Sequence, residues 1–148
     1  MIRLIVPWAI VAAGTALYSF NTYKQSTPPE DWMDVASVTV HPTFVGRAAL
    51  MTVERRIKKP FVGEWGATVR RSTIEGFEVA CTASGAGEYR MDSVLPKKLD
   101  LDWWTYPVKC DLPRGTYRLD TVWTIKPEGY PEKFLKRSSN LFEVRPFE

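Results

Sequence analysis

The most regular alternation of hydrophobic and polar residues in the chain begins after Gly115. One parity of this stretch holds Tyr117, Leu119, Thr121, Trp123 and Ile125. The other parity holds Arg118, Asp120 and Thr124, and Val122 alone departs from the pattern. A period of two residues is typical of a strand with one buried face. We therefore predict a strand from 117 to 125 with Trp123 in the core.

Shorter β-rich runs separated by Gly and Pro occupy the rest of the chain from Val35 onward. We predict strands at 35–40, 48–57, 65–71, 77–81, 99–104 and 134–144. The small residues of 82–87 predict a loop, and 126–133 predicts a hairpin loop. Short strands at this spacing indicate an all-β fold, an antiparallel β-sandwich of about seven or eight strands in one domain over 35–148.

The turn before the regular strand has a recognisable spacing, Leu112-x-x-Gly115-x-Tyr117. It resembles the tyrosine corner of immunoglobulin-like and fibronectin-type sandwiches, in which the Tyr hydroxyl bonds to upstream backbone. Trp65 occupies the place where immunoglobulin-like domains often bury a tryptophan. We therefore expect an immunoglobulin-like sandwich, with structural roles for Leu112, Gly115, Tyr117, Trp65 and Trp123.

The amino-terminal segment carries no charge from Leu4 to Phe20. Because about 20 apolar residues span a hydrocarbon core, we predict that 1–20 forms a transmembrane anchor. Residues 21–34 are polar, contain two prolines, and predict an extended tether. The alternative is a cleaved signal peptide, because Gly14-Thr15-Ala16 offers small residues at a cleavage position. These interpretations place the domain in the periplasm on an inner-membrane anchor, or secreted if 1–16 is removed.

The two cysteines, Cys81 and Cys110, stand 29 positions apart. An even number of cysteines in an exported domain suggests a disulfide. Two buried free thiols are the alternative. The spacing differs from the bridge of antibody domains, because Cys110 precedes the corner Tyr117 instead of following it.

The segment around residue 100 suggests a binding face. Leu99, Leu101 and Trp103 share one parity, and the other parity holds Asp100, Asp102, Trp104 and, if the strand continues, Tyr106. If the leucines face the core, Trp104 projects outward. An exposed Trp is favoured mainly where a partner covers it. The alternative places Trp104 under a loop or against the tether. The candidate binding residues are Asp100, Asp102, Trp104 and Tyr106.

Composition and motifs argue against most catalytic classes. The net charge of +3 is spread along the chain, so no nucleic-acid partner is indicated. One His and two Cys cannot supply a usual zinc framework, and we expect no metal and no cofactor. His41 is the one histidine that a Ser-His-Asp triad could use, and the sequence contains no Gly-x-Ser-x-Gly motif to supply the nucleophilic serine. Asp100 and Asp102 share one face of a strand, which leaves a carboxylate-dependent hydrolase of cell-wall glycans as the enzymatic alternative.

A wider resemblance is carried by several short runs between Thr52 and Val144. They are Val-Glu-Arg-Arg, Trp65, Ala-Cys-Thr-Ala-Ser-Gly, Leu-Asp-Trp-Trp, Leu-Pro-Arg-Gly-Thr-Tyr and Ser-Ser-Asn-Leu-Phe-Glu-Val. Together they resemble small immunoglobulin-like proteins of temperate phages and prophages of proteobacteria. The resemblance implies a phage setting and no particular activity. We expect a non-enzymatic, membrane-tethered binding or structural module with a protein or envelope partner, or alternatively a virion component.

Overall fold

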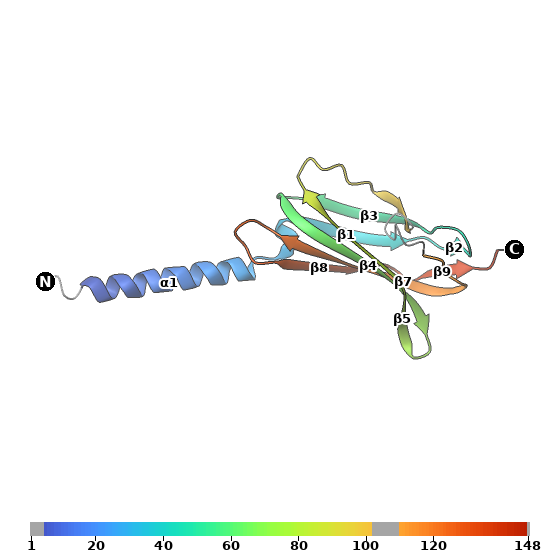
Figure 1. The fold of residues 1–148 in the computed structure, drawn as a ribbon, viewed down its shortest axis with the longest axis horizontal. Helices are drawn as coiled ribbons and strands as arrows, with labels where there is room; N and C mark the ends of the chain where they lie inside the picture. Colours follow the sequence, from blue (N-terminus) through green and yellow to red (C-terminus); the bar gives the residue numbers. More distant parts are fainter. Residues whose placement is uncertain (1–4, 102–109, 148) are drawn as a thin grey trace.

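A computed structural model describes residues 5–101 and 110–147 of the chain. Within these residues it has one α-helix, α1 (Ile5–Ser26), one short 3-10 helix, η2 (Pro29–Asp31), and nine strands (Figure 1). The strands are β1 Met33–Val40, β2 Thr43–Phe44, β3 Leu50–Ile57, β4 Phe61–Thr73, β5 Gly76–Tyr89, β6 Lys98–Asp100, β7 Gly115–Lys126, β8 Lys133–Ser138 and β9 Phe142–Arg145. The chain is thus mostly β, as predicted.

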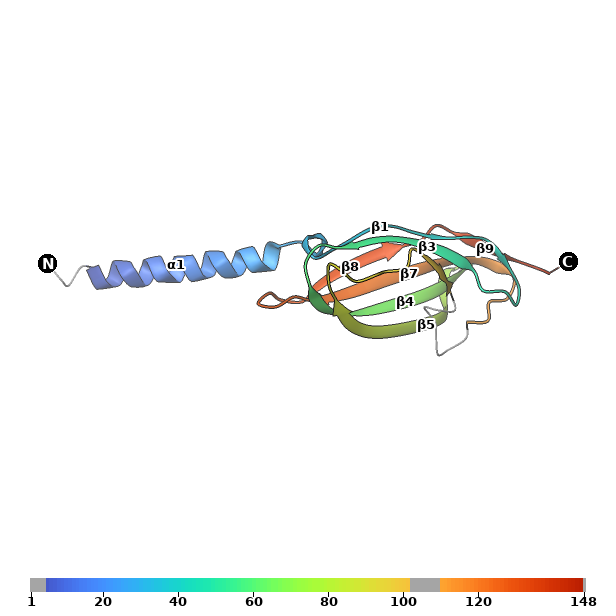
Figure 2. The same ribbon diagram turned by 90° about the horizontal axis from the view of Figure 1, so that it is seen from above.

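The strands form two sheets that face each other across one hydrophobic core (Figure 2). The smaller sheet has the order β1-β3-β6, and the larger has the order β2-β9-β7-β4-β5 with β8 also paired to β7. All pairs are antiparallel except β2 with β9, which is parallel. The expectation of purely antiparallel pairing is therefore wrong at β2, a strand of two residues that follows β9 along the sheet edge.

The alternation along β7 is confirmed residue by residue. All five residues of the predicted inner parity are buried, and the residues between them are half-buried. β7 lies between β4 on one side and β8 and β9 on the other. Trp123 stands opposite Trp65 of β4 in the ladder. Since neighbours flank β7 on both sides, the strand forms the centre of the larger sheet.

The structure corrects the loop predicted at 82–87, because these residues form the middle of β5. They pair one by one with β4, in a ladder that extends from Thr73 opposite Gly76 to Phe61 opposite Tyr89. A bulge interrupts the register between Val69 and Arg70. Alanine, glycine and serine have little preference for strands, so the pairing with β4 overrides their local tendency.

The predicted return strand 134–144 is divided into β8 and β9 by an irregular break at 139–141, and both parts pair with β7. Asn140 lies in this break, accepts a hydrogen bond from the Val40 backbone N–H (2.9 Å) and donates one to the Val40 carbonyl (3.0 Å). The Leu119 N–H donates to the Ser139 hydroxyl oxygen at 2.9 Å. These bonds satisfy backbone groups where regular pairing stops and join the end of β1 to the larger sheet.

The amino-terminal helix differs from the prediction in length and in character. α1 continues through residues 21–26, where an extended tether was expected. Within residues 5–101 and 110–147, no helix is both long enough and apolar enough to cross a membrane. The prediction of a transmembrane helix is therefore wrong for α1. The physical reason is that its last turns carry Asn21, Thr22, Lys24, Gln25 and Ser26, so its apolar part is shorter than about 20 residues.

The carboxyl end of α1 is fixed to the larger sheet by Lys133. This lysine is buried, and its Nζ donates to the carbonyl oxygens of Lys24 and Gln25, both at 2.7 Å. This position favours a cation, because the last carbonyl groups of a helix lack backbone partners and carry partial negative charge. Trp32 and Tyr130 pack edge to face beside it, with ring centroids 5.0 Å apart. The helix projects from this attachment along the long axis of the molecule (Figure 1).

Candidate functional site

The predicted binding face is described only in part. Leu99 and Leu101 are buried, as predicted, and Asp100 between them is exposed. The prediction that one strand continues past Leu101 is wrong, because β6 ends at Asp100 and Leu101 is helical. Asp100 ends β6 and stands opposite Leu50 of β3. The other candidates, Asp102, Trp104 and Tyr106, lie outside the described residues. The structure therefore places one of the four candidate binding residues at the surface and leaves the others as predictions.

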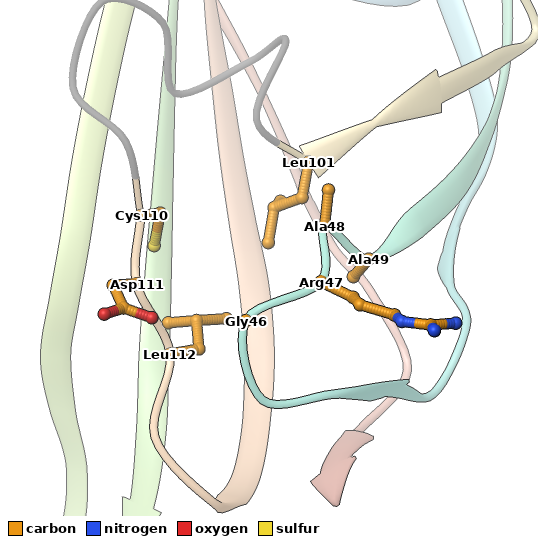
Figure 3. A pocket seen from close by; sticks show the side chains of 8 residues that line it. All are labelled: Gly46, Arg47, Ala48, Ala49, Leu101, Cys110, Asp111 and Leu112. Carbon is orange, nitrogen blue, oxygen red and sulfur yellow. The ribbon is translucent and has the colours of Figure 1, made fainter. Parts of the chain in front are cut away.

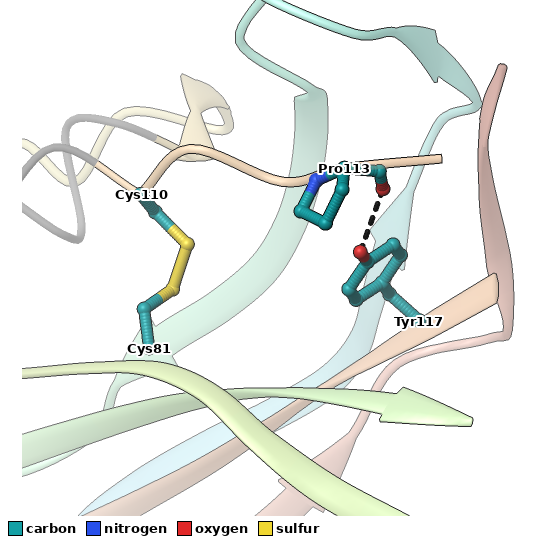
Figure 4. Close-up of a disulfide and its surroundings, with 4 residues drawn as sticks. All are labelled: Cys81, Cys110, Pro113 and Tyr117. Atoms are coloured by element: carbon teal, nitrogen blue, oxygen red, sulfur yellow. Dashed lines mark hydrogen bonds between the residues drawn. A yellow bond between two sulfur atoms is a disulfide. The ribbon is translucent and has the colours of Figure 1, made fainter. Parts of the chain in front are cut away.

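Both ends of the segment that carries these candidates are attached to the two sheets. The Leu101 N–H donates to the Ala49 carbonyl at 2.8 Å, and the Leu101 side chain is 1% exposed in the core. At the other end, Cys110 forms a disulfide with Cys81 of β5, with the Cα atoms 6.0 Å apart (Figure 4). The predicted disulfide is confirmed. The two residues that border 102–109 are thus anchored, Leu101 beside the smaller sheet and Cys110 on the larger sheet.

A hollow of about 230 Å³ lies between these two anchors (Figure 3). Its lining residues are Gly46, Arg47, Ala48, Ala49, Leu101, Cys110, Asp111 and Leu112. Figure 3 shows the side chains of Arg47 and Asp111 directed to opposite sides, away from each other. The Arg47 guanidinium lies over the Phe147 ring, 5.0 Å from its centroid. The two charges therefore do not form a pair across the hollow.

The corner turn lies beside the disulfide (Figure 4). The Tyr117 hydroxyl donates to the Pro113 carbonyl at 2.6 Å, which is the bond that the corner spacing predicts. The ring is buried and stacks on Phe142 with centroids 5.8 Å apart. Burial raises the pKa of Tyr117, and the charge of Arg71 partly offsets this. The corner thus holds the turn after Cys110 in a defined position.

Trp65, predicted as an inward tryptophan, is half-buried and packs against the core. Its indole lies directly under Gly85 of β5, where an added Cβ would stand 2.7 Å from Nε1. On the opposite face of the sheet, the missing side chain of Gly66 leaves a shallow hollow of about 520 Å³. The sequence reasoning missed this part of β5. The available signal was the run of small residues after Cys81, which was assigned to a loop.

A charged cluster centred on Asp120 occupies the outer face of the larger sheet. Arg70 and Arg118 contact the Asp120 carboxylate at 2.9 Å, and the Ser138 hydroxyl donates to it at 2.7 Å. Desolvation raises the pKa of Asp120, but the bonds from Ser138 and Arg118 and the two arginine charges outweigh it, so the pKa is lowered. The cluster therefore holds an ionised carboxylate at neutral pH, which suits a structural role.

Candidate metal ligands are dispersed over the described part of the chain. Within 5–101 and 110–147, no group of three or more His, Cys, Asp or Glu side chains is placed to hold a metal ion. His41, the one histidine of the sequence, follows the end of β1 and is exposed. The Asp100 and Asp102 pair of the hydrolase alternative has one member outside the described residues.

Comparison with known proteins adds no family assignment. No protein-family model matches the chain, and no curated protein sequence matches it. The resemblance to immunoglobulin-like proteins of temperate phages therefore stays a prediction from sequence.

Proposed function

We propose that this protein is a non-enzymatic binding module, built as an immunoglobulin-like β-sandwich, which presents residues 102–109 to a protein or envelope partner. The observation that carries the proposal is the double attachment of this segment. Leu101 fixes one end in the core, and the Cys81–Cys110 disulfide fixes the other. Loops held on a rigid scaffold are common carriers of binding function.

The residue types in the segment support recognition of a partner. Trp and Tyr are enriched among the residues that dominate binding energy, and Trp104 and Tyr106 are the aromatic candidates. Fixed ends lower the conformational entropy that is lost when a loop is ordered by a partner. Asp100, which is exposed and precedes the segment, adds a charge to this set of candidates.

The disulfide also supports a location for the module. Structural disulfides persist in oxidising compartments such as the bacterial periplasm and are rare in the cytosol. We therefore place the domain in the cell envelope or outside the cell. The sequence resemblance adds a phage or prophage setting to this proposal.

The test is capture of a partner by the tagged full-length protein from detergent-solubilised envelopes, with identification by mass spectrometry. Trp104→Ala is expected to weaken binding of the identified partner by about tenfold or more, since buried interface Trp residues often contribute 2 kcal/mol or more. Phe134→Ala is the matched control, because Phe134 is an exposed aromatic residue that belongs to β8 and not to 102–109. Undiminished capture by a normally folded Trp104→Ala protein would overturn the proposal.

A further inference from the structure

β5 is a long sheet edge, and among the described residues it pairs with β4 alone. The other strands at sheet edges are short, charged or covered. β2 has two residues and β6 has three, and β8 carries Lys133, Lys136 and Arg137. The outer side of β1 receives a hydrogen bond from the Arg137 side chain to the Val35 carbonyl, at 2.9 Å. β5, with 14 residues, is the exception.

The middle of β5 lacks the features that usually block an edge. Natural edge strands carry Lys, Pro or inward charges, which discourage pairing with another chain. From Val79 to Gly87, β5 has no charged residue and no proline, over about 30 Å of extended chain. Its one irregularity is the bulge beside Val79. Within 5–101 and 110–147, no strand pairs with the side of β5 away from β4, where backbone donors and acceptors face outward from the sheet.

The side chains of this edge leave room for large neighbours. Ser84 and Ala86 border the hollow over Gly66 on the outer face, whereas on the inner face the indole of Trp65 fills the space beside Gly85. Cross-strand pairs with glycine and alanine are stabilised when the partner residue is aromatic or branched. An added strand therefore fits best when it carries bulky apolar side chains at alternate positions.

A second hollow of about 440 Å³ lies at the carboxyl end of β5. Its walls include Phe61 and Tyr89, whose rings are stacked with centroids 4.8 Å apart, and the exposed Val62. In recognition by strand addition, backbone pairing supplies affinity and pockets for side chains supply specificity. The other walls are Pro60 and the charged residues Glu88, Arg90, Lys126 and Glu128, so an apolar side chain of the added strand fits only against the side formed by Phe61, Val62 and Tyr89.

The charged residues of β5 indicate whether the added strand is a peptide of another protein or the β5 strand of a second copy of this chain. The only charged residues of β5 are Glu78 and Glu88, one near each end. Arg90 contacts Glu88 at 3.3 Å in an exposed pair, which contributes little, and Arg71, opposite Glu78, donates to the Arg114 carbonyl. An antiparallel second copy of β5 brings the Glu78 end of one chain beside the Glu88 end of the other. A strand with basic residues at its ends meets no such repulsion.

From these observations we propose that β5 binds an extended peptide segment of another protein by strand addition. The segment carries alternating bulky apolar residues and a basic residue at each end. This surface goes beyond the function proposed above, because it consists of the β5 backbone edge and not of residues 102–109, and because it uses backbone pairing instead of aromatic burial.

The probe is a synthetic peptide of alternating Thr and Val or Phe residues, with a Lys at each end, titrated into the full-length protein. Saturable binding is expected, with amide shifts in β5 by NMR. N-methylation of the alternate residues that face β5 is expected to weaken binding by roughly tenfold or more, because it removes the backbone donors. N-methylation of the other set, which faces away, is the matched control and is expected to have little effect.

Protein variants test the charge and the site. The double substitution Glu78→Lys and Glu88→Lys is expected to lower the affinity for the Lys-ended peptide severalfold and to raise the affinity for a peptide with Glu at each end. Trp104→Ala is expected to leave peptide binding unchanged, so failure of either proposal is distinguishable from failure of the other. The inference would be overturned if the peptide did not bind, or if both N-methylated peptides bound equally well. A concentration-dependent dimer with protected β5 amides would also overturn it.

Discussion

β7 and β5 are long neighbours of β4 in one sheet, yet different interactions hold them in place. β7 is paired on both sides and places Tyr117, Leu119 and Trp123 in the core. In the part of the chain that the structure describes, β5 is paired on one side only; its residues are mostly exposed, and the Cys81 disulfide attaches it to Cys110. Side-chain burial therefore stabilises the centre of this sheet, whereas a backbone ladder and one covalent bond maintain its edge.

The strongest test of this contrast is Trp123→Ala in β7. We expect a loss of about 3–5 kcal/mol in the free energy of unfolding, because truncation of a buried aromatic residue leaves a cavity. Val122→Ala, one position along and on the half-buried outer face, is the matched control and is expected to cost less than about 1 kcal/mol. Urea denaturation followed by fluorescence and circular dichroism measures both. Equal losses would contradict the assignment of β7 stability to its inner face.

Removal of the disulfide tests the attachment of β5. The double substitution Cys81→Ser and Cys110→Ser is expected to lower the free energy of unfolding by about 3.5 kcal/mol, the chain-entropy value for a loop of this length. Denaturation of the native protein with and without reductant provides the comparison. Hydrogen exchange is expected to increase in β5 more than in β7, and uniform exchange in both strands would show that the bridge does not act locally.

Two glycines of β5 test the packing under the edge. Gly85→Ala places a Cβ 2.7 to 2.8 Å from the Trp65 indole, so a loss of about 1–3 kcal/mol is expected. The matched control is Gly87→Ala, where a Cβ meets nothing within 4 Å. It is expected to be neutral or to stabilise by about 0.5–1 kcal/mol, because glycine costs entropy in a strand. Thermal unfolding of both variants measures the difference in stability. Equal stability of the two variants would show that the Trp65 indole does not pack tightly against Gly85.

The smallest expected effect concerns acid stability and the Asp120 cluster on the outer face of β7. A lowered pKa means that the unfolded chain takes up a proton at a higher pH than the folded one does. The stabilisation is therefore present above the unfolded value of about 4 and is lost as the pH falls below it.

We expect Asp120→Asn to flatten the pH dependence of unfolding below about pH 4 and to cost about 1 kcal/mol at neutral pH. The exposed Asp92→Asn is the control and is expected to retain the native profile. An unchanged acid profile in Asp120→Asn would show that the two arginines do not stabilise the folded carboxylate.

Sequence reasoning succeeded for the fold where side chains determine the structure. The period-two pattern predicted β7, and the parity of Leu99 and Leu101 predicted their burial. It failed at 82–87, because Ala, Gly and Ser contain no periodic signal and their strand conformation depends on pairing with β4. It also failed for α1, where the uncharged run was read as a membrane span although polar residues complete the helix.

The covalent and hydrogen-bonded supports of the candidate site were predictable from the sequence, but the position of its strands in the sheets was not. The cysteine spacing and the corner motif led to the disulfide and to the Tyr117 hydrogen bond with Pro113. The edge of β5 was not predictable, because an unpaired edge is a property of strand order, which no local pattern encodes. Lys133 was likewise missed, since its two acceptors lie more than a hundred positions away in sequence.

The attachment of Lys133 to α1 has a mechanical consequence. The helix and the end of β9 lie at opposite ends of the long axis, and the strands run roughly along it (Figure 1). Tension applied to α1 enters β1 through the backbone and β8 through Lys133. Since ladder hydrogen bonds are perpendicular to the strands, this load shears many of them together instead of peeling them one by one. The molecule is thus built to resist stretching along its length better than a sideways pull on the exposed edge of β5.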